Sequence, residues 1–158
     1  MDRPTLARVL HVLGVVIWIG GVAMVTTTVL PAVRRGYLGD DRLAAFQSIE
    51  RWFVWQARIA IIVVGVTGFY MVAQAHLWDR FSSAEFWWMH AMVFVWVLFA
   101  VALFVVEPFI LDRQLQRWAT TRPDRFFAWL NRAHWVLLAL SLVTICGAVA
   151  GSHGWSVF

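Results

Sequence analysis

Four long apolar segments constrain the fold of this chain more than any other feature. They run from about Val9 to Leu30, Trp52 to Ala75, Phe86 to Leu111 and Ala133 to Gly151, and Pro31 ends the first. A helix that crosses a bilayer needs about 20 mostly apolar residues. Spanning strands would alternate apolar and polar residues, whereas these segments are continuously apolar. We therefore predict an all-α integral membrane four-helix bundle, with residues 1–158 as a single transmembrane domain.

The composition supports this class and excludes several others. The chain is 61% hydrophobic and only 14% charged, with a mean hydropathy of +0.71. All 13 basic residues are arginines placed between apolar runs, which does not suit a nucleic-acid-binding face. The single cysteine, Cys146, allows no intrachain disulfide and no covalent haem attachment. The first apolar run is also too long for a signal-peptide core.

The arginines predict the orientation of the chain in the membrane. The first and third connectors are rich in them, whereas the second holds only Arg80. Arginine in short loops marks the cytoplasmic side of a membrane. We therefore expect a multi-pass protein of the bacterial inner membrane with both termini on the periplasmic side. The arginines of the two rich connectors are Arg34, Arg35, Arg42, Arg51, Arg113, Arg117, Arg122, Arg125 and Arg132.

Local signals place the helix ends near the connectors. Asp40 or Asp41 is expected to cap a short helix that carries Leu43, Phe46 and Ile49 on one face. The stretch 121–124, Thr-Arg-Pro-Asp, has capping-box spacing and is expected to lead directly into the fourth span. Glu107, deep in the third span, is expected to pair with Arg58 or another arginine, with a proton-pathway role as the alternative.

Four of the five histidines are predicted to lie at one depth in the outer leaflet, one from each span. They are His11, His76, His90 and His153, while His134 lies at the opposite edge. Polar residues inside a membrane tend to face the bundle interior and to carry function. Imidazole is the usual protein ligand of haem iron, copper and zinc. The pattern therefore indicates a metal or haem site, although any single histidine could also cap a helix end.

Helical spacing suggests which face would carry such a site. His11, Gly14, Trp18 and Gly21 share one stripe, where glycine leaves room for a flat macrocycle or for a close helix. Trp18 and Trp96 lie in mid-span and are expected to pack or to line a cofactor.

The pairing of the histidines follows from the expected bundle. In an up-down bundle, a haem between diagonal helices would be ligated by His11 with His90, or by His76 with His153. Copper would instead draw the histidines together with the thioethers of Met89 or Met92. Gly147 and Gly151 have the small-residue spacing of a helix contact.

Three segments carry a resemblance to known families. The stretches LHVLGVVIWIGG, FWWMHAM and FFAWLNRAHWVLL resemble the HemJ-type protoporphyrinogen oxidases and the related CopD-like copper-resistance membrane proteins. The resemblance implies a small bundle that binds b-type haem, with His11 and His90 matching the family's histidines. The HemJ-type pattern has lysine two residues after the second of these, where this chain has Met92. The CopD-like branch implies copper handling.

The leading hypothesis is a haem b protein that passes electrons, between quinol and a periplasmic redox protein. His11 and His90 are the first choice of axial ligands, and Gly14 and Trp18 are expected beside the cofactor. Such a protein could act as a haem-dependent oxidoreductase. The alternatives are copper binding or transport, a cofactor-free structural subunit of a membrane complex, and protoporphyrinogen oxidation. A homodimer is also compatible with the sequence.

Overall fold

The computed structural model describes residues 2–39, 41–110 and 116–155, which form helices and turns and no strand. The first helical segment joins α1 (Arg3–Met24), a π-helical turn (Val25–Val29) and α2 (Leu30–Arg34). The second is α3 (Arg42–Gln74), followed by two 3-10 turns (Trp78–Ser82 and Ala84–Phe86). The third joins α4 (Trp87–Val101), a second π-helical turn (Ala102–Val106) and α5 (Glu107–Ile110). The last elements are α6 (Gln116–Thr121) and α7 (Pro123–Ser152).

Four of these helical segments are long and apolar enough to cross a membrane, as the sequence predicts. Within their most apolar windows, between 17% and 33% of the residues are buried inside the protein. The remaining apolar surface needs a lipid environment, because a soluble monomer rarely exposes so much contiguous apolar area. The chain is therefore a multi-pass membrane protein. The predicted end of the third span at Leu111 lies outside the described residues.

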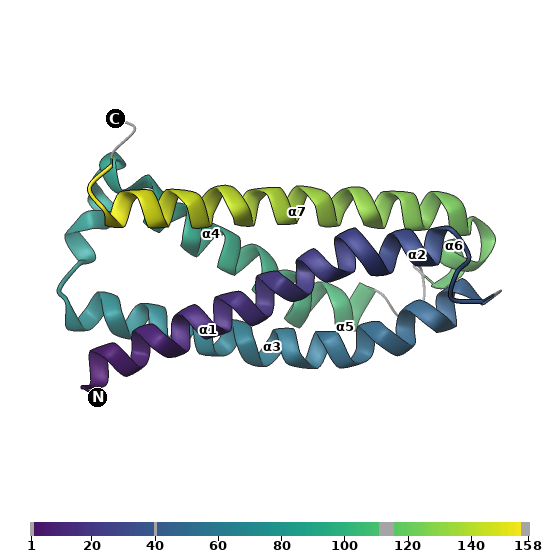
Figure 1. Ribbon diagram of the computed structural model, residues 1–158, viewed down its shortest axis with the longest axis horizontal. Helices are drawn as coiled ribbons and strands as arrows, with labels where there is room; N and C mark the ends of the chain where they lie inside the picture. Colours follow the sequence, from purple (N-terminus) through teal and green to yellow (C-terminus); the bar gives the residue numbers. More distant parts are fainter. Residues whose placement is uncertain (1, 40, 111–115, 156–158) are drawn as a thin grey trace.

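The two ends of the bundle differ in composition. Figure 1 shows the start of α1, the end of α7 and the connection between α3 and α4 together at one end of the bundle, which we call the terminal end. The other end carries the arginines of the remaining connectors, and we call it the arginine end. Its arginines among the described residues are Arg34, Arg35, Arg42, Arg51, Arg117, Arg122, Arg125 and Arg132.

The helices associate as two pairs. α1 lies along α3, and α4 lies along α7 (Figure 1). In the first pair, Gly14 lies against Ala60 and Val64, and Gly21 lies under the ring of Phe53. Glycine lets two helices approach closely, which supplies the van der Waals contact that drives association in lipid. These contacts fix the antiparallel register, in which Trp18 lies at about the level of Ala57.

The second pair uses the glycines of α7. Trp87 covers Gly147 and Trp88 covers Gly151, so each large ring fills the space that a side chain would occupy. The predicted packing role of the two glycines is confirmed. Because the two glycines are one turn apart, the two adjacent tryptophans at the start of α4 pack on consecutive turns of α7.

The interior has two apolar clusters. The first lies in mid-bundle, where Trp18 and Phe99 meet edge to face at 4.9 Å between ring centroids. The second lies toward the arginine end, around Phe46 and Phe127. This cluster holds the predicted apolar face of Leu43, Phe46 and Ile49 against α7 and α2.

Each π-helical turn precedes a proline inside a helix. The sequence predicts that the first span stops at Pro31, yet the helical segment continues to Arg34. Proline lacks an N–H and its ring clashes with the carbonyl four residues back. In the widened turn, Leu30 N–H bonds to Val25 O, five residues back, and the helix passes the proline. The same device precedes Pro108, where Glu107 N–H bonds to Ala102 O.

Two predicted helix starts are correct in position but differ in detail. Asp41 caps α3, since its carboxylate accepts a hydrogen bond from Ala44 N–H at 3.0 Å. The helix it starts is not short, however, but continues through the second span to Gln74. α7 begins at Pro123, but the Thr121 hydroxyl donates back to Arg117 O instead of forming the predicted capping box. Asp40 lies outside the described residues.

Candidate functional site

His11 is the one predicted ligand whose ring lies half-buried between two helices. Its Nδ1 lies 3.0 Å from Val64 O and 3.2 Å from the Thr67 hydroxyl oxygen on α3. A carbonyl can only accept, so Nδ1 carries the proton and Nε2 keeps its lone pair. The ring packs over Gly68, whose missing side chain leaves room for it. A hydrogen bond from the second ring nitrogen is what orients a metal-ligating histidine.

The other three predicted ligands are exposed at the terminal end. His76 follows α3 with a left-handed φ of 52°, and His153 follows α7 with its Nδ1 at 2.8 Å from Val149 O. His90 opens α4 and has both ring nitrogens near carbonyls, Nδ1 at 3.3 Å from Phe86 O and Nε2 at 3.0 Å from Phe81 O. A neutral imidazole has one N–H and can satisfy only one of these carbonyls.

The four histidines are not gathered into a single cluster. Among the described residues, no three or more histidine, cysteine, aspartate or glutamate side chains are placed to hold a metal ion. Haem needs fewer protein donors, because two axial ligands complete its iron. α1 and α4 belong to different pairs (Figure 1), so His11 and His90 lie on helices across the bundle from each other, as the diagonal arrangement predicts.

Some of the remaining predicted site residues are accounted for by contacts within the protein. The space beside Gly14 is filled by Val64, so this glycine serves helix contact. Trp96 packs over Gly65 and donates its indole N–H to Ile61 O at 2.9 Å. Trp18 is 4% exposed, and its indole N–H has no hydrogen-bond partner among the described residues. Met89 is buried in α4, and Met92 is half-buried.

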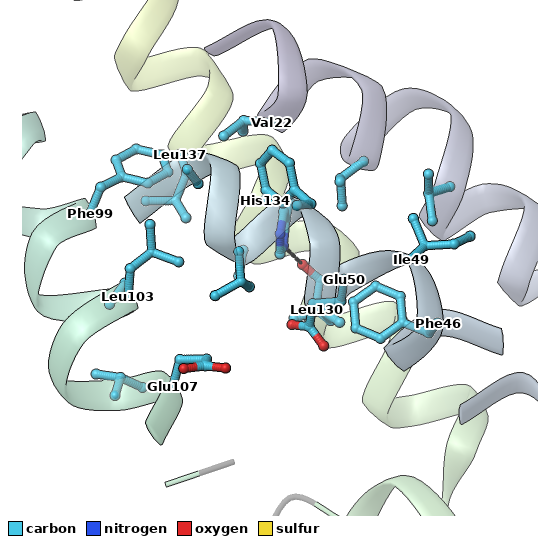
Figure 2. Close-up of a pocket in the computed structure, with 18 of the residues that line it drawn as sticks. Val22, Phe46, Ile49, Glu50, Phe99, Leu103, Glu107, Leu130, His134 and Leu137 are labelled. Atoms are coloured by element: carbon cyan, nitrogen blue, oxygen red, sulfur yellow. Dashed lines mark hydrogen bonds between the residues drawn. The ribbon is translucent and has the colours of Figure 1, made fainter. Parts of the chain in front are cut away.

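A cavity of about 280 Å³ occupies the arginine-end half of the bundle. Its wall is mostly apolar and comes from all four helical segments. Figure 2 shows Glu50, Glu107 and His134 around this space, with the two carboxylates apart from each other. Trp18 closes the wall toward mid-bundle. The cavity therefore combines an apolar surface with four polar side chains.

Glu107 is held by Arg58, which confirms the predicted partner. The guanidinium of Arg58 forms an ion pair with Glu107 and also donates from Nε and Nη2 to Leu103 O, at 3.2 and 3.0 Å. Both side chains are about 30% exposed or less. The charge of this half-buried carboxylate is therefore compensated by a partner within the bundle.

Glu50 has no such partner. Among the described residues its carboxylate accepts no hydrogen bond and forms no ion pair, although it is close enough to Glu107 to interact electrostatically. His134 donates from Nδ1 to Leu130 O at 2.9 Å, the bond drawn in Figure 2, which leaves Nε2 as an acceptor. Glu50 and Nε2 of His134 are thus two acceptors in one cavity.

Sequence reasoning missed this cavity, although a signal for it exists. Glu50 follows Phe46 by four residues and precedes Phe53 and Val54 by three and four, so it lies on the apolar face of its helix. A carboxylate in that position must be paired, neutral or functional. The same spacing to Leu130, Leu137 and Leu138 places His134 inside.

No known family model, curated protein or solved structure matches the chain.

Proposed function

We propose that this protein binds haem b in the terminal-end half of the bundle and carries electrons within the membrane. The observation that supports this most directly is the orientation of His11. Its Nδ1–H is held by Val64 O and Thr67, which leaves Nε2 as a basic nitrogen in a half-buried position. That is the tautomer and the anchoring that an axial haem ligand needs.

His90 is the proposed second ligand, and its geometry supports this role less directly. It lies on α4, which is paired with α7 across from α1 and α3. Its contacts with Phe81 O and Phe86 O come from the turn and the helix start beside it, and a neutral ring cannot satisfy both. His76 and His153 are the alternative pair. Bound haem supplies reversible one-electron chemistry at iron, and the chain supplies the axial nitrogens and an apolar surrounding.

The proposed setting is the bacterial inner membrane, with both termini and the outer histidines on the periplasmic side. The arginines at the opposite end support this orientation. With this orientation the haem lies near the periplasmic surface, within reach of a soluble redox protein that accepts its electrons.

The test is a reduced-minus-oxidised visible spectrum of the protein purified in detergent from cells with ample haem, with haem quantified as its pyridine complex. We expect b-type bands in the wild type, loss of most haem from His11→Ala, and an altered spectrum or loss in His90→Ala. Leu13→Ala, on the lipid-facing side of α1, is the control and should keep full haem. A colourless wild type would overturn the proposal and would direct attention to copper analysis.

A further inference from the structure

The cavity at the arginine end holds polar groups that the haem proposal does not use. Trp18 contributes an indole N–H that is buried and unpartnered among the described residues. A buried donor without an acceptor is destabilising, because it has lost its hydrogen bond to water and gained none in the protein. Trp96, the other mid-span tryptophan, satisfies its N–H on Ile61 O. The unsatisfied donor is therefore a specific feature of the side chain that faces the cavity.

The cavity wall also presents acceptors. Glu50 offers a carboxylate without a partner among the described residues, and His134 offers the lone pair of Nε2 because Nδ1 is committed to Leu130 O. Figure 2 shows both residues at the cavity wall. A ligand that satisfies these acceptors must therefore bring an O–H or N–H donor.

The register of α1 on α3 gives the backbone levels of Trp18 and Glu50 along the bundle. Gly21 meets Phe53 and Gly14 meets Ala60, so Trp18 lies near the level of Ala57. Glu50 is seven residues further toward the arginine end, or about 10 Å at a rise of 1.5 Å per residue. One six-membered ring with a hydrogen bond of about 2.8 Å at each of two opposite oxygens spans a similar length.

The apolar part of the cavity wall suits an aromatic ring. Trp18 and Phe99 meet edge to face in this wall, and apart from Glu50, Glu107 and His134 the remaining lining is aliphatic or aromatic. The site lies within the membrane-spanning part of the bundle, so its ligand must be lipophilic. We propose that this cavity binds the head group of a quinol, with Trp18 N–H donating to one ring oxygen and the other hydroxyl donating to Glu50 or to Nε2 of His134.

The choice of a quinol as the ligand rests in part on the proposed electron-transfer function. The binding site itself rests on the cavity, its unpartnered donor and its acceptors. Binding and haem content are therefore measured separately, so that either proposal can fail alone.

The experiment measures binding of decylubiquinol to the detergent-purified protein by calorimetry under anaerobic conditions. Decylbenzene, which carries a similar tail on a ring without oxygens, is the comparison ligand. We expect saturable binding of the quinol and at least 10-fold weaker binding of decylbenzene. Equal binding of both, or no quinol binding, would overturn the site, because it would show a cavity that takes any lipid tail or nothing.

Two variants test the polar contacts. Trp18→Phe keeps the ring but removes the donor and should weaken quinol binding about 3- to 10-fold, the effect of one neutral hydrogen bond. Glu50→Gln should weaken it as well. The matched control is Trp96→Phe, which removes a donor outside the cavity; it should lower the thermal transition and leave binding unchanged. If Trp18→Phe folds as the wild type does and binds the quinol equally well, the assignment of Trp18 is wrong.

The haem content of each preparation separates the two proposals. Quinol binding that depends on Trp18 in a colourless protein would support the quinol site and contradict the electron-transfer function. A protein that contains haem but binds no quinol would support the electron-transfer function and contradict the quinol site.

Discussion

Arg58 donates two hydrogen bonds to the carbonyl of Leu103, at 3.0 and 3.2 Å. This carbonyl follows Ala102, whose own carbonyl accepts from Glu107 N–H in the π-helical turn. The next donor in that register would be residue 108, which is proline and has no N–H. The guanidinium of Arg58, on α3, therefore donates to Leu103 O in place of the missing N–H of Pro108. It also forms the ion pair with Glu107.

This arrangement predicts coupling between Arg58 and Pro108. Arg58→Ala should destabilise the protein by at least about 1–3 kcal/mol, because it leaves Leu103 O and Glu107 without their donor. In a Pro108→Ala background the new N–H of residue 108 can reach Leu103 O. The loss of stability caused by Arg58→Ala should therefore be smaller there, by about 0.5 kcal/mol or more. Thermal unfolding in detergent of the four proteins in this cycle measures the difference. Strict additivity would show that the guanidinium does not replace the missing N–H.

The tryptophan contacts on α7 predict a strong position dependence for glycine substitution. Gly147→Ala places a methyl group too close to the edge of the Trp87 ring and should destabilise the protein by about 1–3 kcal/mol. Gly20→Ala is the matched control, because nothing lies within 4 Å of its new methyl group. It should be neutral or stabilising, by up to about 1 kcal/mol, since alanine favours a helix over glycine. Equal thermal transitions for the two variants would contradict the close approach of α4 and α7.

The anchoring of His11 predicts an effect of Thr67 on haem binding. The Thr67 hydroxyl donates to Val63 O and accepts from His11, so it helps to hold the ring. Thr67→Val should weaken haem affinity about 10-fold while leaving the fold intact, and Thr67→Ser should restore it. Haem titration of the apoprotein measures this. An affinity unchanged by Thr67→Val would show that Thr67 does not orient the ligand.

The proposed orientation predicts which residues can be reached from outside the cell. In a Cys146→Ser background, Ser82→Cys at the terminal end should react with a membrane-impermeant maleimide in intact spheroplasts. Ser48→Cys, near the arginine end of α3, should react only after permeabilisation. Both serines are exposed, so the two sites are matched in access. The reverse labelling pattern would place the termini in the cytoplasm.

The sequence alone determined the number of spans and one pair of packing residues. Four apolar runs of sufficient length, arginine-rich connectors and the paired glycines Gly147 and Gly151 are local features, and each constrains its own segment directly. The N-cap at Asp41 and the pairing of Glu107 with Arg58 could also be predicted, because a polar group at such a position must find a partner.

Only the tertiary structure decided how the helices pass their prolines and where a cavity remains. The helix through Pro31 depends on a π-helical turn, whose cost is offset by the packing of Leu30 and Val33 in the arginine-end cluster. The cavity arises because side chains from four helical segments leave a space that no single segment specifies. Glu50 and His134 are 84 residues apart in the sequence, and only the arrangement of all four helical segments around one space places them in the same wall.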